Sequence, residues 1–576
     1  MLKLNLSYKG KLDPEITVLF NNISKQLRGP FTDIVSRLSE PIKSDINWWV
    51  EGPSSRNTLV SPFFHYYCTL NLIDELIKKN YDISEILVDS FAFKKILKEY
   101  FHTTGKSILI KYNGNRLISY FKQLIIPFVK IPIELYRRIY QYQCSQKTKH
   151  LQKPIRNKPL TLIDVFAFTG FISKDRYYNG LWDSLNNEQK ESTFFVPTLV
   201  MIPLKKMVSS YKELRTADRN FLIKEDYLKL SDILFAVGHY FKLFKIKIRP
   251  TLVLGIDISS LVNEELSSMR GYTSAVESLL NYRFAKRIKE QKLNLRLVID
   301  WFENQVVDKG WNAGFKEFYP DIPTVGYRGF ISISQYLCSY PSEIEDNSGI
   351  LPSRIAVTGK GLIDSTKEFA TNLTIESSPA FRYQHVWDNT KIETDSYYFT
   401  ILVALSIVNE ESINVLQLIK NYLKSSDSNN LRFWIKSHPA VKNEKLKEQF
   451  VDWPDDFNCV TGDFSKIIVK SDLMISNASS TCMEALACGI PVIVVENIYG
   501  LSYNTVPDEI PQVLWRSCRT TDDIKNAIKH YQYRSNAEID THNEIGMEIK
   551  KLYFTPVTKK NVRKFLLMDS PIHTYS

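Results

Sequence analysis

Short apolar runs alternate with longer helix-like stretches along most of this sequence, and this alternation limits the folds that the chain can adopt. The runs have the length of β-strands and are found at 46–52, 83–90, 106–112, 160–168, 193–202 and 295–303, and again at 354–361, 396–407, 431–439, 472–479 and 489–496. Helix-like stretches such as 61–80 and 226–244 separate them. Strands that alternate with helices in this way favour an α/β protein whose parallel sheets are covered by helices on both faces.

The polar, turn-rich segment 338–354 divides the strand candidates into two series, and we interpret it as a domain linker. We therefore expect two Rossmann-like lobes that face each other across a cleft, an N-terminal acceptor-side lobe at 1–345 and a C-terminal lobe at 346–545. The basic tail at 546–576 is expected to form a closing helix. Ligands of such sheets bind at the carboxyl ends of the strands, so the residues that follow the strands are the candidates for function.

The chain of 576 residues carries a formal charge of +11, and one segment accounts for all of it. Between 105 and 158 there are twelve Lys and Arg and a single acidic residue, Glu134, interleaved with Leu, Ile, Phe and Tyr. This pattern fits an amphipathic element on an anionic membrane surface or against a lipid-linked acceptor, or an ordinary helix with a solvated basic face. Apolar residues at the centre of the segment argue against a nucleic-acid partner.

Cysteine usage and terminal sequence indicate the compartment. Seven Cys are scattered without a C-x-x-C pair, so we expect neither a zinc site nor a disulfide framework, but a reducing environment. The N-terminus lacks the apolar region of a signal peptide, and no stretch approaches the ~20 apolar residues of a membrane-spanning helix. We expect a cytoplasmic protein that is at most peripheral on the inner membrane.

The C-terminal series contains the strongest candidates for a nucleotide site. One strand candidate ends in Lys436-Ser437-His438-Pro439, which places a Lys and a His at the rim of the sheet. Another ends before a hydroxyl-rich turn that opens a helix, where hydroxyls and backbone N–H groups bind phosphate; its residues are Ser479, Ser480 and Thr481, with Glu484 in the first turns. Gly359, in a turn after the strand candidate at 354–361, is expected to offer its backbone to a donor phosphate.

The N-terminal series contributes carboxylates. Asp300 and Glu303 lie where the strand candidate 295–303 ends, and one of them is expected to take a proton from an acceptor hydroxyl or to act as a nucleophile. Glu51, after the strand candidate 46–52, is a second candidate base. Neighbouring polar residues are expected to bind the acceptor or the donor sugar; they are Arg56, Asn304, Gln305 and Lys309.

The order of these motifs resembles the nucleotide-binding lobe of GT-B glycosyltransferases. His438-Pro439 followed by Ser479-Ser480 and an E-A-x-x-x-G-x-P-V segment is most similar to bacterial sialyltransferases, polysialyltransferases and the Kdo transferases of capsule and O-antigen synthesis. In those families the two motifs bind the cytidine monophosphate of a CMP-sugar. Glycerophosphotransferases that use CDP-glycerol carry a similar pair of motifs. Related sialyltransferases have an acidic-acidic-Gly motif where this chain has Val50-Glu51-Gly52.

The resemblance implies a transferase that moves a CMP-activated ulosonic acid, such as Kdo or a sialic-like acid, onto a capsule, O-antigen or lipopolysaccharide glycan. The chain contains no D-x-D pair, so we expect neither a metal nor another cofactor beside the CMP-sugar. Three alternatives remain open: a CDP-glycerol or CDP-ribitol alditol-phosphate transferase, a UDP-sugar 2-epimerase, and an inactive scaffold in a polysaccharide assembly.

Overall fold

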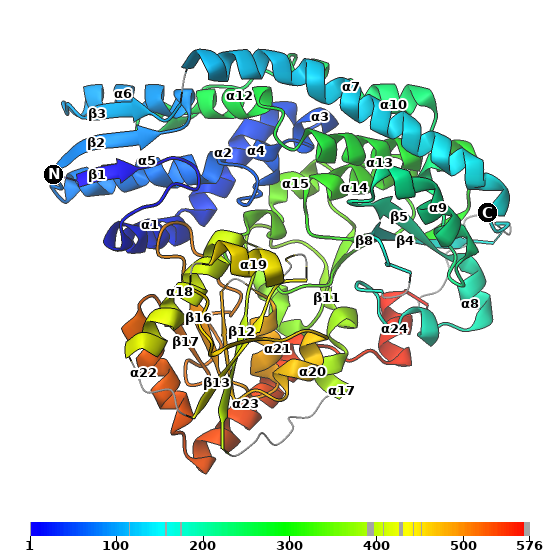
Figure 1. Cartoon of the computed structure of the whole chain (residues 1–576). Coiled ribbons are helices and arrows are strands. Elements are labelled where there is room, and N and C mark those ends of the chain that lie inside the picture. The colour runs from blue at the N-terminus through cyan, green and yellow to red at the C-terminus, as the bar shows by residue number, and fades with distance from the viewer. Residues whose placement is uncertain are drawn as a thin grey trace.

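The computed structural model describes residues 2–568 except 115, 156–157, 173–174, 389–396, 407, 426–429, 440, 442, 451 and 478. In the described part the chain forms three parallel sheets, one of three strands and two of six, and a two-stranded antiparallel hairpin. The two six-stranded sheets lie in the upper and lower parts of the molecule, and the three-stranded sheet lies beside the upper one (Figure 1).

The N-terminal sheet has the order β1-β2-β3, formed by Leu2–Asn5, Ile83–Val88 and Leu109–Tyr112. Its core contains apolar residues from the helices that pack on it: α1 (Pro14–Gln26), α2 (Arg28–Ser39), α5 (Phe63–Lys78), α6 (Phe91–Thr103) and α12 (Ser259–Ser267). The hairpin of β6 (Leu252–Val253) and β7 (Ile256–Asp257) closes one side of this core. The expected N-terminal lobe therefore contains a separate small sheet.

The central sheet is parallel and has the order β11-β10-β9-β8-β4-β5. Its strands are Ile375–Ser377, Arg354–Val357, Thr324–Arg328, Leu295–Trp301, Leu160–Ala167 and Thr193–Leu199. Most residues of β4, β5, β8 and β9 are buried, as expected for strands that are covered on both faces. The covering helices include α7 (Arg116–Thr148), α9 (Met207–Thr216), α10 (Leu230–Val237), α13 (Tyr272–Glu290) and α14 (Val306–Phe318).

The C-terminal sheet is also parallel and has the order β14-β13-β12-β15-β16-β17. Its strands are Phe457–Cys459, Leu431–Lys436, Phe399–Ala404, Leu473–Ser476, Val492–Val495 and Trp515–Cys518. Its helices are α18 (Asn409–Ser425), α19 (Asn443–Gln449), α20 (Phe464–Ile468), α21 (Thr481–Ala487), α22 (Thr521–Gln532) and α23 (Asn536–Tyr553). Two six-stranded parallel sheets in two lobes confirm the predicted fold class.

The boundary between the lobes differs from the sequence prediction. The strand expected to open the C-terminal lobe is β10, which pairs with β9 and β11 inside the central sheet. The C-terminal sheet begins only at β12. The expected linker at 338–354 is mostly buried and contains the short helix α15 (Glu343–Asn347). Within it, Glu345 forms ion pairs with cations of two other segments, an arrangement that local polarity does not reveal.

The prediction of a strand at 46–52 is also wrong. This segment forms two short helices, α3 (Ile46–Trp49) and α4 (Gly52–Ser55). The Asp45 side chain caps α3 by accepting a hydrogen bond from the backbone N–H of Asn47. Trp48 and Trp49 are both buried, and a run of apolar residues this short has the same appearance in a buried strand and in a buried helix.

The predicted tail at 546–576 begins inside α23 and continues into one further short helix. After α23 the chain returns to the central sheet as α24 (Lys559–Phe565). The Phe565 ring lies 5.3 Å from that of Tyr327 on β9 and 5.4 Å from that of Phe381, centroid to centroid. The chain thus crosses between the lobes twice, once between β11 and β12 and once between α23 and α24. Residues 569–576 of the predicted tail lie outside the described residues.

Candidate active site between the two six-stranded sheets

The carboxyl ends of the two larger sheets contribute charged side chains to one cleft. Lys436 is the last residue of β13 and His438 follows it, and Glu303 and Arg382 follow β8 and β11 of the central sheet. Charged groups of the two lobes influence each other's pKa values. Arg176 of the central lobe lowers the pKa of His438, and Glu484 of the C-terminal lobe raises the pKa of Arg382. Facing carboxyl ends are where ligands of doubly wound sheets bind.

His438 is half-buried in the C-terminal wall of this cleft. Burial lowers the pKa of its imidazole, and the nearby cations Arg176 and Lys436 lower it further. The ring is therefore predominantly neutral at pH 7. It borders a shallow surface depression, lined also by Leu405, Ser406, Asn409, Ser412, Ser437, Val441 and Leu446. Burial also lowers the pKa of Lys436, which is half-buried, whereas Pro439 is exposed.

The hydroxyl-rich turn lies directly before helix α21, as predicted. Ser479 Oγ and Thr481 Oγ1 are 2.7 Å apart, and the backbone N–H of Thr481 donates to Ser479 Oγ over 3.3 Å. Thr505 Oγ1 donates to the carbonyl oxygen of Ser479 and so ties the turn to the loop after β16. Ser479, Ser480 and Thr481 are half-buried, so their hydroxyl groups keep some contact with solvent.

Glu484 contacts a histidine that the sequence analysis did not select. The Nε2 atom of His385 on α17 (His385–Asp388) lies 2.6 Å from Glu484 Oε2. Arg382, three residues before His385, lies 5.8 Å from the Trp301 ring centroid. Burial lowers the pKa of Arg382, but electrostatic interactions with Tyr383, Glu484 and Glu303 outweigh this and raise it. Arg382 therefore lies in the electrostatic field of acidic groups from both cleft walls.

Glu303 is held in a defined position at the end of β8. Its carboxylate accepts hydrogen bonds from Trp301 Nε1, over 2.9 Å, and from Gln305 Nε2. The Asp308 carboxylate accepts from the backbone N–H groups of Glu303 and Gln305, both over 2.9 Å, and so fixes the turn that opens α14. Glu303 is half-buried. Burial raises the pKa of the nearby Tyr177, and the negative charge of Glu303 raises it further.

Asp300 does not lie at the rim. It is part of β8, is buried, and accepts a hydrogen bond from Asn312 Nδ2 over 2.7 Å. Burial raises the pKa of Asp300 well above its ordinary value, and the neighbouring carboxyl groups of Asp308 and Asp164 raise it further. A carboxyl group that is buried in this way cannot reach an acceptor, so the structure does not support the predicted role of Asp300 as a base or nucleophile.

Glu51 is also inside the protein, away from any strand end. Its Oε1 atom lies 2.6 Å from Nε2 of His239, and Nδ1 of His239 lies 2.9 Å from Asn47 Oδ1. Glu51 and His239 are both buried, between α4 and α11 (His239–Leu243). Burial raises the pKa of Glu51, although the hydrogen bond and charge of His239 oppose this. The geometry assigns Glu51 to packing, which corrects the prediction.

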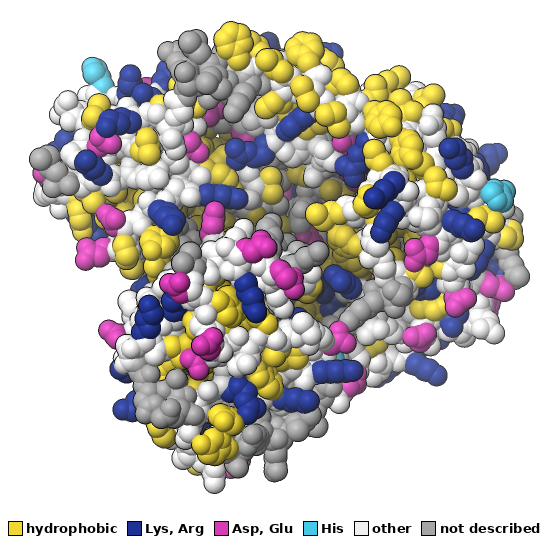
Figure 2. Space-filling view, in the orientation of Figure 1, with side chains coloured by type: hydrophobic (Ala, Val, Ile, Leu, Met, Phe, Trp, Pro, Cys, Tyr) yellow, Lys and Arg dark blue, Asp and Glu magenta, His cyan; other side chains and the backbone are white. Residues whose placement is uncertain are grey.

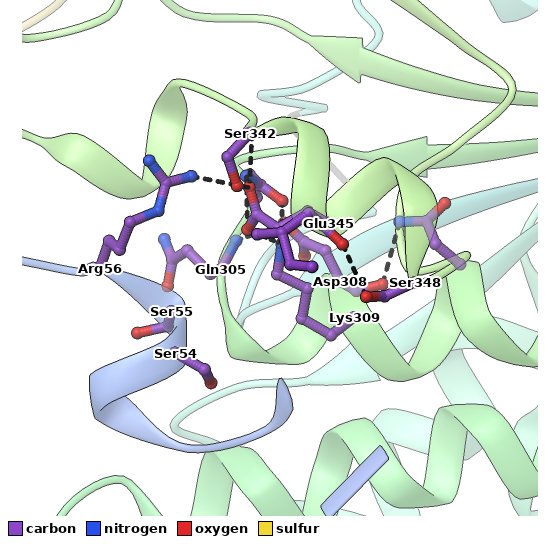
Figure 3. Close-up of polar contacts among 12 residues, drawn as sticks. Ser54, Ser55, Arg56, Gln305, Asp308, Lys309, Ser342, Glu345 and Ser348 are labelled. Carbon is purple, nitrogen blue, oxygen red and sulfur yellow. Dashed lines mark hydrogen bonds and ion pairs between the residues drawn. The ribbon is translucent and has the colours of Figure 1, made fainter. Parts of the chain in front are cut away.

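Three of the four expected acceptor-binding residues converge on Glu345 instead of the cleft (Figure 3). Arg56 Nη2 lies 2.7 Å from Glu345 Oε2, and Lys309 Nζ lies 2.6 Å from Glu345 Oε1. Asn304 donates to both Glu345 oxygens and accepts from Lys309. All four residues are buried, so Arg56, Asn304 and Lys309 join three segments of the chain. Only Gln305, beside Glu303, is near the cleft.

Gly359 is a packing residue. A Cβ atom there would lie 2.3 Å from the carbonyl oxygen of Leu552 and 2.4 Å from the carbonyl carbon of Tyr553, at the end of α23. Gly359 therefore allows α23 to approach the end of β10, which corrects its expected role as a phosphate-binding turn.

Known proteins offer limited guidance. No family model and no curated protein matches the chain. Solved structures with a similar fold include a putative UDP-N-acetylglucosamine 2-epimerase from Listeria monocytogenes, at 11% identity and a TM-score of 0.43, covering 73% of this chain and 98% of that one. A UDP-GlcNAc 2-epimerase from Neisseria meningitidis shows 12% identity, a TM-score of 0.41, and coverage of 71% and 100%. MurG from Acinetobacter baumannii shows 10% identity and a TM-score of 0.39, and the match covers 71% of this chain and 100% of that one.

Proposed function

We propose that this protein is a glycosyltransferase that binds an anionic nucleotide-sugar in the cleft and transfers the sugar to a bacterial surface glycan. The observation that supports this proposal is the meeting of Arg176, Lys436 and His438 at the facing carboxyl ends of the two larger sheets. Two cations and a neutral imidazole suit a phosphate group. Arg382, on the central wall, adds a third cation beside Glu303.

The donor that fits this charge best is a CMP-activated ulosonic acid. Such a donor carries two anionic groups, the phosphodiester and the sugar carboxylate, and the cleft offers cations on both walls. In the proposed complex His438, Ser479 and Ser480 hold the phosphate and ribose, and Arg382 pairs with the carboxylate. Hydrogen bonds to a phosphate that gains charge as it leaves stabilise the transition state, typically by a factor of about 10²–10³ for each donor.

Glu303 is the proposed base. Its carboxylate takes the proton of the acceptor hydroxyl while the acceptor oxygen forms a bond to the anomeric carbon. The bond between that carbon and the phosphate oxygen breaks, and CMP leaves with the electron pair. Trp301 and Gln305 hold the carboxylate in place for this step, which is a requirement for efficient proton transfer.

Four donors tested side by side distinguish the proposal from its alternatives: CMP-Kdo, CMP-sialic acid, CDP-glycerol and UDP-GlcNAc. The proposal expects release of CMP in the presence of a glycan acceptor, and a loss of about 10²-fold or more in the His438→Ala variant. The matched control is His102→Ala, since His102 is an exposed histidine at the end of α6. Normal turnover of the His438→Ala variant contradicts the proposal.

Other outcomes identify other functions. Turnover of CDP-glycerol alone indicates an alditol-phosphate transferase. Isomerisation of UDP-GlcNAc without an acceptor indicates a 2-epimerase, the activity that the names of two similar solved structures give for those proteins. Failure of every nucleotide to bind in calorimetry indicates a scaffold protein without activity.

A further inference from the structure

Helix α7 has apolar residues on two sides: Ile126, Ile131 and Leu135 pack against the core, and a second apolar set is exposed. Its inward side carries the polar network: Arg138 pairs with Glu134, over 2.7 Å, and with Glu277 on α13. Gln141 donates to Glu225 and Ser145 donates to Asp226. Its outward side is apolar, with exposed residues three or four positions apart; they are Phe121, Leu124, Ile125, Phe128, Val129, Ile133 and Tyr136. A helix at the surface of a water-soluble protein ordinarily exposes charged and polar residues on its outward side.

The neighbouring helices extend this apolar surface. On α10, which packs alongside α7, Leu230 and Leu234 are exposed while Asp232 is buried in ion pairs with Arg283 and Arg287. On and after α11, Phe241 and Phe244 are exposed. Figure 2 shows hydrophobic side chains gathered at the upper right, where α7 and α10 lie. We call this surface, formed by the exposed apolar residues of α7, α10 and 239–249, the outer face.

The exposed charges of the outer face are basic. Helices α7, α10 and α11 contain two acidic residues, Glu134 and Asp232, and both are buried. The exposed cations include Lys130 on α7, and the segment after α11 adds Lys245, Lys247 and Arg249. These cations alternate with apolar residues in the sequence FKIKIR at 244–249.

We propose that the outer face docks on the surface of an anionic lipid bilayer. Exposed aromatic and aliphatic residues with a basic border are the features of an element that lies in the membrane interface, where rings enter the acyl boundary and cations contact headgroups. Phe128 and Phe244, with exposed fractions of 81% and 70%, are the principal anchors. No helix among the described residues is long and apolar enough to cross a membrane, so the contact is one of docking.

The structure refines the predicted basic segment at 105–158. Arg138 cannot contact lipid because it is buried in the network with Glu134 and Glu277. The cations at 245–249 lie outside that segment but directly follow α11, which packs against α10. A solvated basic helix is not what α7 forms, since its outward side is mainly apolar. The outer face is separate from the cleft, so this inference does not depend on the proposed function.

Co-sedimentation with vesicles tests the proposal. The probes are vesicles of phosphatidylcholine alone and of phosphatidylcholine mixed with phosphatidylglycerol. The full-length protein is expected to bind the anionic vesicles at least about tenfold more tightly, and high salt is expected to weaken this binding. Phe128→Ser with Phe244→Ser, and separately Lys245→Glu with Lys247→Glu, are each expected to lower binding to anionic vesicles by about tenfold or more.

Matched controls carry the same changes elsewhere. Lys525→Glu with Lys529→Glu reverses two exposed charges on α22, and Tyr533→Ser removes a ring that is 74% exposed. Both are expected to bind vesicles like the unchanged protein. Circular dichroism confirms that each variant is folded, and nucleotide binding, measured separately, is expected to be unchanged because the outer face does not contribute to the cleft.

Two results overturn the proposal. One is the absence of binding to anionic vesicles, or equal binding by the outer-face variants and the unchanged protein. The other is a dimer in light scattering that Phe128→Ser with Phe244→Ser dissociates while vesicles are not bound, because the outer face would then be covered by a second copy of the chain.

Discussion

Glu345 provides the sharpest test of the energetic reasoning. Its carboxylate is buried between Arg56 and Lys309, and it also accepts hydrogen bonds from the backbone N–H and the hydroxyl of Ser342. Burial alone raises the pKa of such a group, but Lys309, Arg56 and the hydrogen bonds outweigh it and lower the Glu345 pKa to about 2. The Glu345→Gln substitution keeps the shape of the side chain and leaves two buried cations without a counter-charge.

The expected loss of stability is obtained in two ways. A fall of the carboxyl pKa from 4.5 to about 2 on folding corresponds to about 3 kcal/mol of stability at neutral pH. Removing one partner of a buried ion pair typically costs about 3–5 kcal/mol, because the other charge remains buried. Since the entropy of unfolding is about 2.1 cal/mol/K per residue, about 3–5 kcal/mol in a chain of 576 residues should lower Tm by roughly 2–5 °C in the Glu345→Gln variant.

The dependence on pH has a definite sign. Because the folded protein lowers the pKa of Glu345, its contribution is fully present above about 4.5 and is lost as pH falls through about 2. The difference in stability between the unchanged protein and Glu345→Gln should therefore be largest at neutral pH and should shrink in acid. Urea denaturation monitored by tryptophan fluorescence at several pH values measures it.

Two controls accompany this experiment. Glu343→Gln changes an exposed carboxylate on the same helix and should have little effect. Simultaneous replacement of Arg56, Lys309 and Glu345 by Met removes all the buried charges and should be less destabilising than Glu345→Gln alone. A Glu345→Gln protein within about 1 kcal/mol of the unchanged protein at neutral pH would refute the reasoning.

Three further predictions concern the cleft and the packing of the helices. The pKa of His438 is lowered in the free protein, and a bound anionic donor should raise it again because the donor offsets the neighbouring cations. Donor binding should therefore tighten as pH falls from 7 toward 5. Calorimetry should show that the His438→Asn substitution removes this pH dependence. Glu303→Gln should lower kcat by about 10²–10⁴-fold while the Kd for the donor is unchanged, and normal turnover would exclude Glu303 as the base. A Cβ atom at Gly310 would lie 1.8 Å from the carbonyl oxygen of Ser278, so Gly310→Ala should destabilise the protein by about 3 kcal/mol or more in urea denaturation, whereas Gly29→Ala, with open space around it, should not.

Most central strands of both large sheets could be predicted because their signal is local, but β9, which is buried between β8 and β10, was not among the predicted strands. Runs such as 160–168 and 489–496 are continuous and apolar, as required of strands that are covered on both faces. The edge strands β11, β14 and β17 were missed, since they are only three or four residues long and partly exposed. The assignment of β10 to the wrong lobe has a different cause, because pairing between distant strands leaves no local signature.

Sequence reasoning located the cleft better than it assigned roles. Glu303 and His438 were found because both lie just after a strand that the pattern identifies. Arg56 and Lys309 have the same residue types as ligand-binding cations, and only their burial against Glu345 reveals a different role. Arg382 follows β11, a strand that was not predicted, so nothing in the local pattern marked the arginine as a residue of the rim.

The return of α24 to the central sheet has a consequence for biosynthesis. Val562, Phe565 and Leu566 belong to the same apolar core as residues of β4 and β8. During synthesis this core therefore cannot be packed completely until nearly the whole chain has been made. At about 5–20 residues per second, the roughly 200 residues after β11 need about 10–40 seconds, during which Tyr327 and Phe381 lack their partner ring. A chain that ends before α24 should remain a client of chaperones.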